Sequence, residues 1–175
     1  RKILTVAEDF SVYQRFLRSV ENEWLSQSGE IIAQFSYTDL NNDMSRINEL
    51  LEDTEADTIL IAVSPDAAQN LRPYLGTRLP IYAPSIIHTS RIDKLRMHDL
   101  EEVRFLEMPW IIDKKSKFVT GRGKGQSLQL ERFYALGIDA YEITSMIVSD
   151  PLNIPNTIQG RSGIITFSNP LFIRD

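Results

Sequence analysis

Residues 58–63 read Thr-Ile-Leu-Ile-Ala-Val, a short run of apolar and β-branched side chains. Because nearly every position is apolar, a strand here would be buried on both faces rather than on one. Strands of that kind are typical of a parallel sheet with helices packed on its two sides. The stretch therefore predicts an α/β fold in which residues 58–63 form an inner strand.

The segments on either side alternate between strand and helix patterns. Short apolar runs predict further strands at 2–7, 31–35 and 80–83. Strand-helix-strand repeats with short loops predict an open parallel sheet with helices on both faces, with its strands in the order 2-1-3-4. Candidate caps for the intervening helices are Ser11, residues 41–43 and Asp66, and Pro73 is expected to kink or end the third helix.

The regular alternation of strand and helix patterns ends near residue 90. A strand is expected at 103–106, a basic glycine-rich loop at 113–125, a long helix at 126–148 and a last strand at 163–167. Gly137 lies inside the long helical pattern, which indicates close packing there. Trp24 follows the apolar stripe of the first helix and is expected in the core, whereas Trp110 is interpreted equally as a core residue or a contact residue.

Composition limits the class of protein. The chain has 175 residues, 42% apolar and 25% charged, as in an ordinary globular domain. A net charge of −5 argues against a nucleic-acid binder, which would be basic. No transmembrane run or signal peptide is visible, and the absence of cysteine excludes disulfides, thiolate metal sites and a Cys nucleophile. Because the first residue is Arg1, we expect the chain to be processed or cut from a longer one.

A cluster of oxygen-bearing side chains has the spacing of a calcium loop at its start. Asp39, Asn41 and Asp43 occupy positions 1, 3 and 5 of such a loop. Met44 and Leu50 stand where the loop needs Gly and Glu. Helix capping therefore explains the cluster better than a metal site.

The stretch Gly-Arg-Gly-Lys-Gly at 121–125 looks like a phosphate cradle. Its spacing does not match a P-loop, and no buried strand precedes it. We interpret the segment as a solvated loop, with docking to an acidic partner or an anionic polymer as the alternative. The basic residues of this loop are Lys114, Lys115, Lys117, Arg122 and Lys124.

No set of residues supports catalysis. Glu8 and Asp9 end the first strand like the acid pair of a phospho-acceptor receiver domain, but Ser64 stands where the third acid is needed. Neither of the two histidines has a metal-binding spacing, and Ser85, near His88, lacks the Gly-x-Ser-x-Gly context of a nucleophile. The sequence therefore predicts no catalytic residue, no metal and no cofactor.

Ligands of open α/β sheets bind beyond the carboxyl ends of the strands. Two loops of the predicted sheet are candidates for that edge. The first is Glu8-Asp9-Phe10, after the first strand, and the second is Ser64-Pro65-Asp66, after the third.

Several stretches together resemble the LppC/LpoA family of bacterial outer-membrane lipoproteins. Their order and spacing over most of the chain are more specific than any single piece. The stretches are AD at 56–57, AVSP at 62–65, LPIYAPS at 79–85, VRFLEMPW at 103–110, RFYALGIDAY at 132–141 and GRSG at 160–163.

The resemblance implies a fold like that of type I periplasmic binding proteins, in which two α/β lobes enclose a cleft. Residues 1–100 and 160–175 would form one lobe with the parallel sheet. Residues 101–159 would form a crossover segment and a long helix that belongs to, or reaches toward, a second lobe, so the two-lobed domain is expected to be incomplete. The family's lipid-bearing Cys is absent, as expected if an N-terminal part has been removed.

The resemblance also implies a non-catalytic protein of the periplasm, tethered to the outer membrane by a lipid anchor outside this chain. Its partner would be a peptidoglycan synthase, a bifunctional penicillin-binding protein that it activates. The alternative is a solute-binding lobe for a small polar or amino-acid-like ligand, which would show convergent polar groups on both lobes. Carried over to this chain, the cleft residues are Glu8, Asp9, Phe10, Ser64, Pro65, Asp66 and Ser85 to His88, with Trp110 as a further contact candidate.

Overall fold

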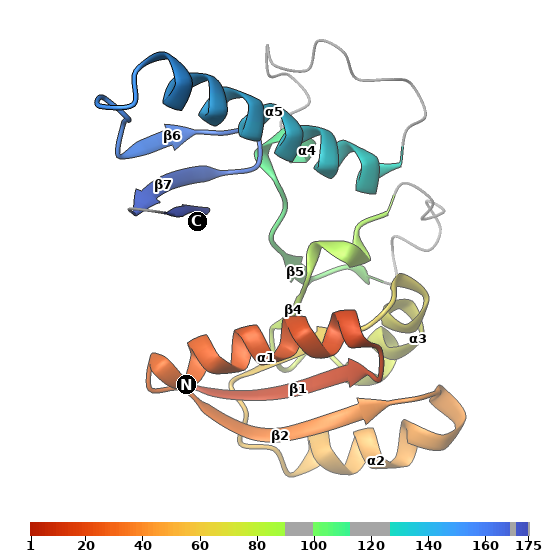
Figure 1. Ribbon diagram of the computed structural model, residues 1–175. Helices are drawn as coiled ribbons and strands as arrows, with labels where there is room; N and C mark the ends of the chain where they lie inside the picture. The colour runs from red at the N-terminus through yellow and green to blue at the C-terminus, as the bar shows by residue number, and fades with distance from the viewer. Residues whose placement is uncertain (90–99, 113–126, 169–170, 175) are drawn as a thin grey trace. The chain divides into compact units, whose positions relative to one another are not determined.

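The structure is a computed structural model that describes residues 1–89, 100–112, 127–168 and 171–174. Contacts within the chain divide it into unit 1, Arg1–Leu106, and unit 2, Glu107–Asp175. Each unit contains its own β-sheet, parallel in unit 1 and antiparallel in unit 2 (Figure 1). Among the described helices, none combines the length and apolar character needed to cross a bilayer.

The sheet of unit 1 has five parallel strands in the order β2-β1-β3-β4-β5. This confirms the predicted order 2-1-3-4, and the strand expected near residue 103 adds the far edge. All five residues of β3 are buried, as its apolar sequence predicts. The strands are β1 (Lys2–Glu8), β2 (Glu30–Tyr37), β3 (Thr58–Ala62), β4 (Ile81–Ala83) and β5 (Val103–Phe105).

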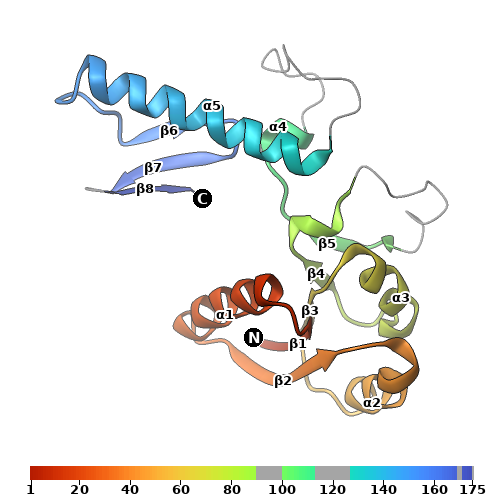
Figure 2. The same ribbon diagram turned by 45° about the vertical axis from the view of Figure 1, so that its right-hand side comes forward.

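Helices cover both faces of this sheet. Figure 2 shows α1 on one side and α2 and α3 on the other. The side chains of β1 alternate accordingly, since Ile3 and Ala7 pack with α1 whereas Leu4 and Val6 pack with α2 and α3. The helices are α1 (Ser11–Ser26), α2 (Leu40–Glu52), α3 (Pro65–Leu75) and the short 3-10 helix η1 (Ser85–Ile87).

Two of the expected helix caps are wrong by one or two residues. Phe10 precedes α1 and gives no side-chain cap, so Ser11 lies inside the first turn. For α3 the cap is Ser64, whose hydroxyl accepts a hydrogen bond from the Ala67 amide at 3.3 Å, and Asp66 follows in the first turn. Proline is favoured at the first helical position, so Pro65 moves the cap one residue upstream of it.

Two further expectations about helices differ from the structure. Helix α3 continues past Pro73 and ends at Leu75, because Gly76 adopts a φ of 65° that side-chain-bearing residues rarely take. Trp24 is only partly buried, at the end of α1, and its indole nitrogen donates a hydrogen bond to the carbonyl of Glu30 at 3.3 Å.

The caps expected at residues 41–43 lie inside α2, which begins at Leu40, but Asp43 still binds the backbone that leads into the helix. Its carboxylate accepts hydrogen bonds from the Thr38 amide at 2.7 Å, the Thr38 hydroxyl at 2.9 Å and the Asp39 amide at 3.2 Å. These bonds satisfy two backbone donors just before α2. Among the described residues, no three acidic or histidine side chains lie close enough to share a metal ion.

Unit 2 pairs one long helix with a short helix and a small sheet. Trp110, Ile111 and Ala135 form its buried core. The elements are α4 (Pro109–Ile112), α5 (Leu128–Ser149), β6 (Thr157–Gln159), β7 (Ile164–Ser168) and β8 (Leu171–Arg174), with the strands in the order β6-β7-β8.

The last strand differs from its expected placement. From the sequence, residues 160–175 are expected to return to the lobe that holds the parallel sheet, but β7 pairs antiparallel with β6 and β8 inside unit 2. These three strands follow one another closely along the chain, and short connections favour antiparallel hairpins.

Candidate functional site

The loops that follow β1, β3 and β4 share one edge of the unit 1 sheet, because these strands are parallel neighbours. Strand β1 runs beside β3 with Ala7 opposite Ala62, so Glu8 arrives next to the loop that opens α3. We name the segments 8–10, 64–66 and 85–88 the strand-end loops. The structure thus brings together on one sheet edge the loops that the sequence singles out.

Glu8 and Ser64 are bound to each other across this edge. The carboxylate of Glu8 accepts a hydrogen bond from the Ser64 amide and a second from the Ser64 hydroxyl, the latter at 3.2 Å. The same hydroxyl accepts from Ala67 as the cap of α3. Glu8 therefore satisfies donors at the start of α3 that would otherwise face solvent or a ligand.

The residues around this pair leave an acidic edge with one exposed aromatic ring. Asp9 and Asp66 are exposed. Phe10 is 61% exposed and meets the ring of Tyr13 edge-on, with the centroids 6.2 Å apart. A surface of this kind suits a polar or basic partner better than an anionic solute.

The loop after β4 carries the remaining predicted residues of this edge. Ser85 opens η1, and its carbonyl accepts the amide of His88 at 3.0 Å. The His88 imidazole packs against Phe105 at the end of β5, with the ring centroids 5.3 Å apart. The contact gives His88 a packing role on the sheet edge.

Trp110 is a core residue. Its side chain is buried in unit 2, and its indole nitrogen donates to the carboxylate of Glu131 at 2.8 Å. Tyr134 packs on the same ring at 5.8 Å. The interpretation of Trp110 as an exposed contact residue is therefore wrong, because an apolar segment after Pro109 folds into helix α4 and buries the ring.

The five basic residues Lys114, Lys115, Lys117, Arg122 and Lys124 lie outside the described residues, so their predicted loop has no structural account.

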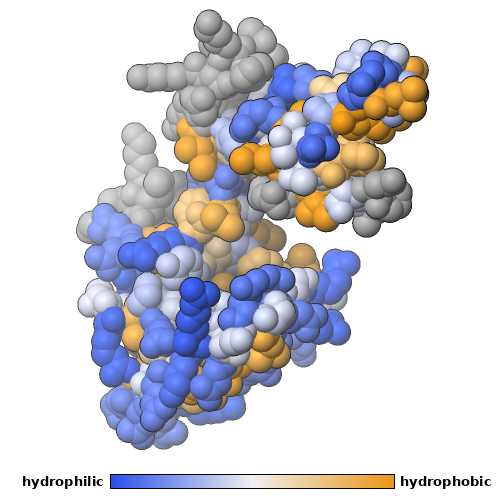
Figure 3. All heavy atoms as spheres, turned by 90° about the vertical axis from the view of Figure 1, so that its left-hand side faces the viewer, coloured by the Kyte–Doolittle hydropathy of each residue, from blue (hydrophilic) through white to orange (hydrophobic). Residues whose placement is uncertain are grey.

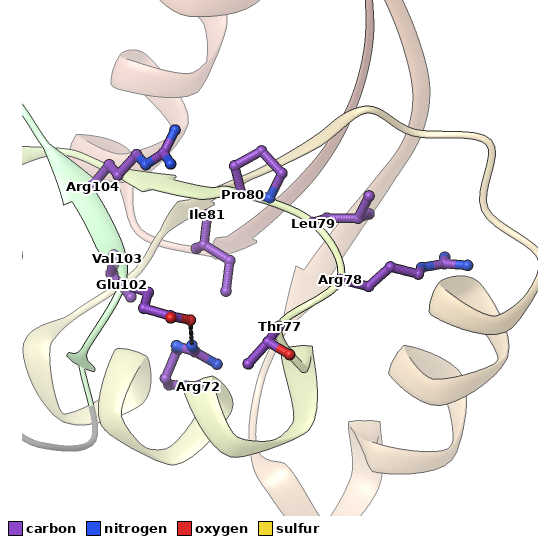
Figure 4. Close-up of a pocket in the computed structure, with 9 residues that line it drawn as sticks. All are labelled: Arg72, Thr77, Arg78, Leu79, Pro80, Ile81, Glu102, Val103 and Arg104. Atoms are coloured by element: carbon purple, nitrogen blue, oxygen red, sulfur yellow. Dashed lines mark hydrogen bonds and ion pairs between the residues drawn. The ribbon is translucent and has the colours of Figure 1, made fainter.

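A hollow of about 490 Å³ lies where β4 and β5 begin, at the end of the sheet away from the strand-end loops. It is lined by three arginines, among them Arg72, which pairs with Glu102 at 3.3 Å. Figure 4 shows the guanidinium groups of Arg72, Arg78 and Arg104 pointing in different directions. Because they do not converge, the hollow lacks the arrangement that would bind an anion.

A second hollow, of about 540 Å³, lies between α1 and the sheet and is mostly apolar. Trp24, Leu60 and Tyr82 line it. Tyr82 is 41% exposed there because α1 does not extend over β4.

Helix α5 arranges its charges in an unusual way. Its four charged residues all have partners within unit 2: Glu131 binds Trp110, Arg132 pairs with Glu107 at 2.5 Å, and Asp139 and Glu142 bind segment 161–162. The exposed side of the helix carries mostly apolar and aromatic side chains and no charged one, and Figure 3 shows hydrophobic side chains gathered at the surface of unit 2. The exposed large hydrophobic residues of α5 are Leu130, Phe133, Tyr134, Leu136, Tyr141, Ile147 and Val148.

Sequence reasoning missed this inward set of charges. The signal was available as Glu131 and Asp139 within an otherwise apolar helical pattern, two turns apart on one face. Gly137 is exposed on the outward side, and a methyl group added there would meet nothing within 4 Å. The close packing expected at Gly137 is therefore not made within unit 2.

Comparison with known proteins gives a family and a fold. The family model described as "LppC putative lipoprotein" matches residues 14–170. A search of curated proteins finds no match. The solved structure titled as a putative branched-chain amino acid ABC transporter from Chromobacterium violaceum has a TM-score of 0.82 at 24% identity, covering 99% of this chain and 56% of that one.

Two structures from Haemophilus influenzae are also similar. The LpoA C-domain, titled a regulator of PBP1A, has a TM-score of 0.76 at 19% identity and covers 100% of this chain and 57% of that one. Full-length LpoA has a TM-score of 0.75 at 20% identity, with 33% of its length covered. The chain thus spans little more than half the length of the first two structures. At these identities the likeness establishes the fold, a lobe of the periplasmic-binding-protein type.

Proposed function

The chain belongs to the family described as "LppC putative lipoprotein", and from that premise we propose that it is a non-catalytic domain that regulates peptidoglycan synthesis. In this proposal it binds and activates a bifunctional penicillin-binding protein. The observation that carries the proposal is the family match over residues 14–170. The likeness to the LpoA C-domain, a regulator of PBP1A by its title, supports the same partner class.

The proposed location is the periplasm, with the full-length protein tethered to the outer membrane by a lipid anchor that lies outside these 175 residues. The family description as a lipoprotein supports an anchored envelope protein. An envelope location also fits the proposed partner, because penicillin-binding proteins act on peptidoglycan outside the inner membrane.

A non-catalytic role is supported by how the best chemical candidates are used. The Glu8 carboxylate is bound to Ser64, and the His88 ring is packed on Phe105. A general base must be able to reach a substrate proton, and these contacts hold both groups in structural roles.

We propose the strand-end loops as the partner surface. Asp9, Phe10 and Asp66 are exposed on one sheet edge, where an aromatic ring supplies apolar contact area and two carboxylates supply charge. The basic loop is a second candidate contact, through its lysines.

Helix α5 supports a proposal about domain organisation. Its outward face carries Phe133 and Tyr141, at 60% and 74% exposure, and no charged residue. Apolar surface of this extent is disfavoured in water at about 25 cal/mol per Å². We propose that unit 2 belongs to a second lobe, whose remaining elements come from chain outside these 175 residues and cover this face.

The second candidate function is a solute-binding lobe for a small polar or amino-acid-like ligand. The structural likeness to a protein titled as a putative branched-chain amino acid ABC transporter favours it. The Glu8–Ser64 bonds oppose it, because they occupy amide and hydroxyl donors that a ligand carboxylate would use.

A binding experiment separates the two candidates. The bifunctional penicillin-binding protein of the same organism is immobilised, and association of the full-length protein is followed by surface plasmon resonance. We expect saturable binding, and no heat of binding when amino acids are titrated into the protein. Binding of an amino acid without binding of the synthase would favour the solute-binding function instead.

The basic loop has its own test in the same assay. The double variant Lys114→Gln with Lys115→Gln should slow association, and added salt should reproduce the effect. The matched control is Arg15→Gln with Arg18→Gln, which removes two exposed charges from α1. Equal association rates for both variants would show that the lysines do not contact the partner and lie in a solvated loop.

A further inference from the structure

The bonds between Glu8 and Ser64 join two places 56 residues apart in the chain. Glu8 is the last residue of β1, and Ser64 is the cap that precedes α3. One carboxylate oxygen accepts the Ser64 amide and the other accepts the Ser64 hydroxyl. The contact therefore has the two-point geometry by which a protein holds a carboxylate.

The place where this carboxylate lies is chemically favourable for an anion. Ser64 is the cap of an 11-residue helix, whose dipole stabilises negative charge at this end. It also lies beyond the carboxyl ends of β1 and β3, where α/β proteins bind ligands. In this chain a side chain of the protein itself fills that place.

We propose that Glu8 is an internal substitute for a carboxylate ligand, and that it latches the loop between β3 and α3 to the end of β1. While Glu8 is bound to Ser64, the Ser64 amide and hydroxyl cannot bind an external carboxylate such as that of an amino acid. When the Glu8 side chain is removed, the same donors become a site for a small free carboxylate. This assignment goes beyond the proposed function and does not depend on which partner the protein binds.

The negative charge of Glu8 acts on two neighbouring tyrosines. Tyr13 and Tyr37 are both buried. Burial raises the pKa of each phenol, and the nearby charge of Glu8 raises both pKa values further. The exposed carboxylates of Asp9 and Asp66 lie on the same loops and add to the field that disfavours a second anion.

Chemical rescue tests the latch. In the full chain, Glu8→Ala should lower the midpoint of thermal unfolding by roughly 3–10 °C, because charged hydrogen-bond partners are lost at the start of α3. Sodium acetate should restore most of this loss, with an effect that saturates as its concentration rises. Acetamide and sodium chloride at matched concentrations should not, since neither supplies a carboxylate.

Two control variants make the result decisive. Asp9→Ala removes the exposed acid that directly follows Glu8 in the chain, so it should change the midpoint little and give no response to acetate beyond that of the parent chain. Glu8→Gln keeps the space filled, so it should lower the midpoint less than Glu8→Ala and also fail to respond. An acetate effect of equal size in all variants, or no fall in the midpoint of Glu8→Ala, would overturn the proposal.

Discussion

The carboxylate of Asp139 accepts hydrogen bonds from both the amide and the hydroxyl of Ser162, at 2.8 and 2.6 Å. The Arg161 amide adds a third bond at 2.7 Å. Asp139 is buried, so these bonds form where water does not replace them. They fix the turn between β6 and β7 to the middle of α5.

Asp139→Ala should destabilise unit 2 more than a typical surface change. Three donors would lose their acceptor in a buried place, which costs about 2–4 kcal/mol in the free energy of unfolding. Urea unfolding followed by circular dichroism measures the loss. The control Asp150→Ala alters an exposed acid just beyond the same helix, and a comparable loss in both variants would contradict the assigned role of Asp139.

Gly160 and Gly137 form a matched pair for a packing test. A methyl group on Gly160 would lie 2.7 Å from the Asp139 carboxylate and 2.8 Å from the Ile165 side chain, whereas one on Gly137 would meet nothing within 4 Å. Gly160→Ala should therefore destabilise by about 1–3 kcal/mol. Gly137→Ala, inside exposed helix, should stabilise by about 0.5–1 kcal/mol. Thermal unfolding of the two variants should shift in opposite directions, and a shift in the same direction would count against this packing.

Asp43 gives unit 1 an acid-sensitive contribution to stability. Burial alone would raise the pKa of Asp43, but hydrogen bonds from Thr38 and Asp39 and the nearby Arg46 guanidinium outweigh it, so the pKa is lowered. A carboxylate whose pKa is lower in the folded than in the unfolded protein stabilises the folded state at every pH above the unfolded pKa. This stabilisation is lost as the pH falls through the folded pKa.

Asp43→Asn should accordingly cost about 1–2 kcal/mol near neutral pH and progressively less below about pH 4. Unfolding free energies measured between pH 7 and pH 3 test the slope. Asp53→Asn, at an exposed acid just after α2, serves as the control. If the cost of Asp43→Asn were the same at every pH, the charged hydrogen bonds would not be its source.

The apolar face of α5 predicts how the isolated chain and the full-length protein differ. The double variant Phe133→Ser with Tyr141→Ser should reduce self-association of the 175-residue chain, which light scattering detects. In the full-length protein it should lower stability by about 2 kcal/mol or more, because the face would be buried there. Tyr82→Ser, which alters an exposed aromatic residue of unit 1, is the control. Unchanged stability of the full-length variant would contradict the second-lobe proposal.

The fold of unit 1 could be predicted because its signals are local. The apolar run at 58–63 and the alternation of strands and helices determine a parallel sheet, and right-handed crossovers leave few strand orders. The Glu8–Ser64 bonds could not be predicted, since they depend on the register of β1 against β3 across 56 residues.

The helix caps and the last strands could not be predicted from the sequence pattern alone. Ser64 and Asp66 are both good caps, and only the place of Pro65 at the first helical position decides between them. Strand β7 could pair either with its neighbour β6 or with the parallel sheet of unit 1. The apolar pattern of β7 does not indicate which of the two it joins.

The most direct test of the central claim is the activity of the synthase itself. Peptidoglycan polymerisation and cross-linking by the purified bifunctional penicillin-binding protein are measured with and without the full-length protein, at concentrations that saturate binding. The account predicts that the rate rises severalfold with the protein present. An unchanged rate at saturating protein would contradict the regulatory function.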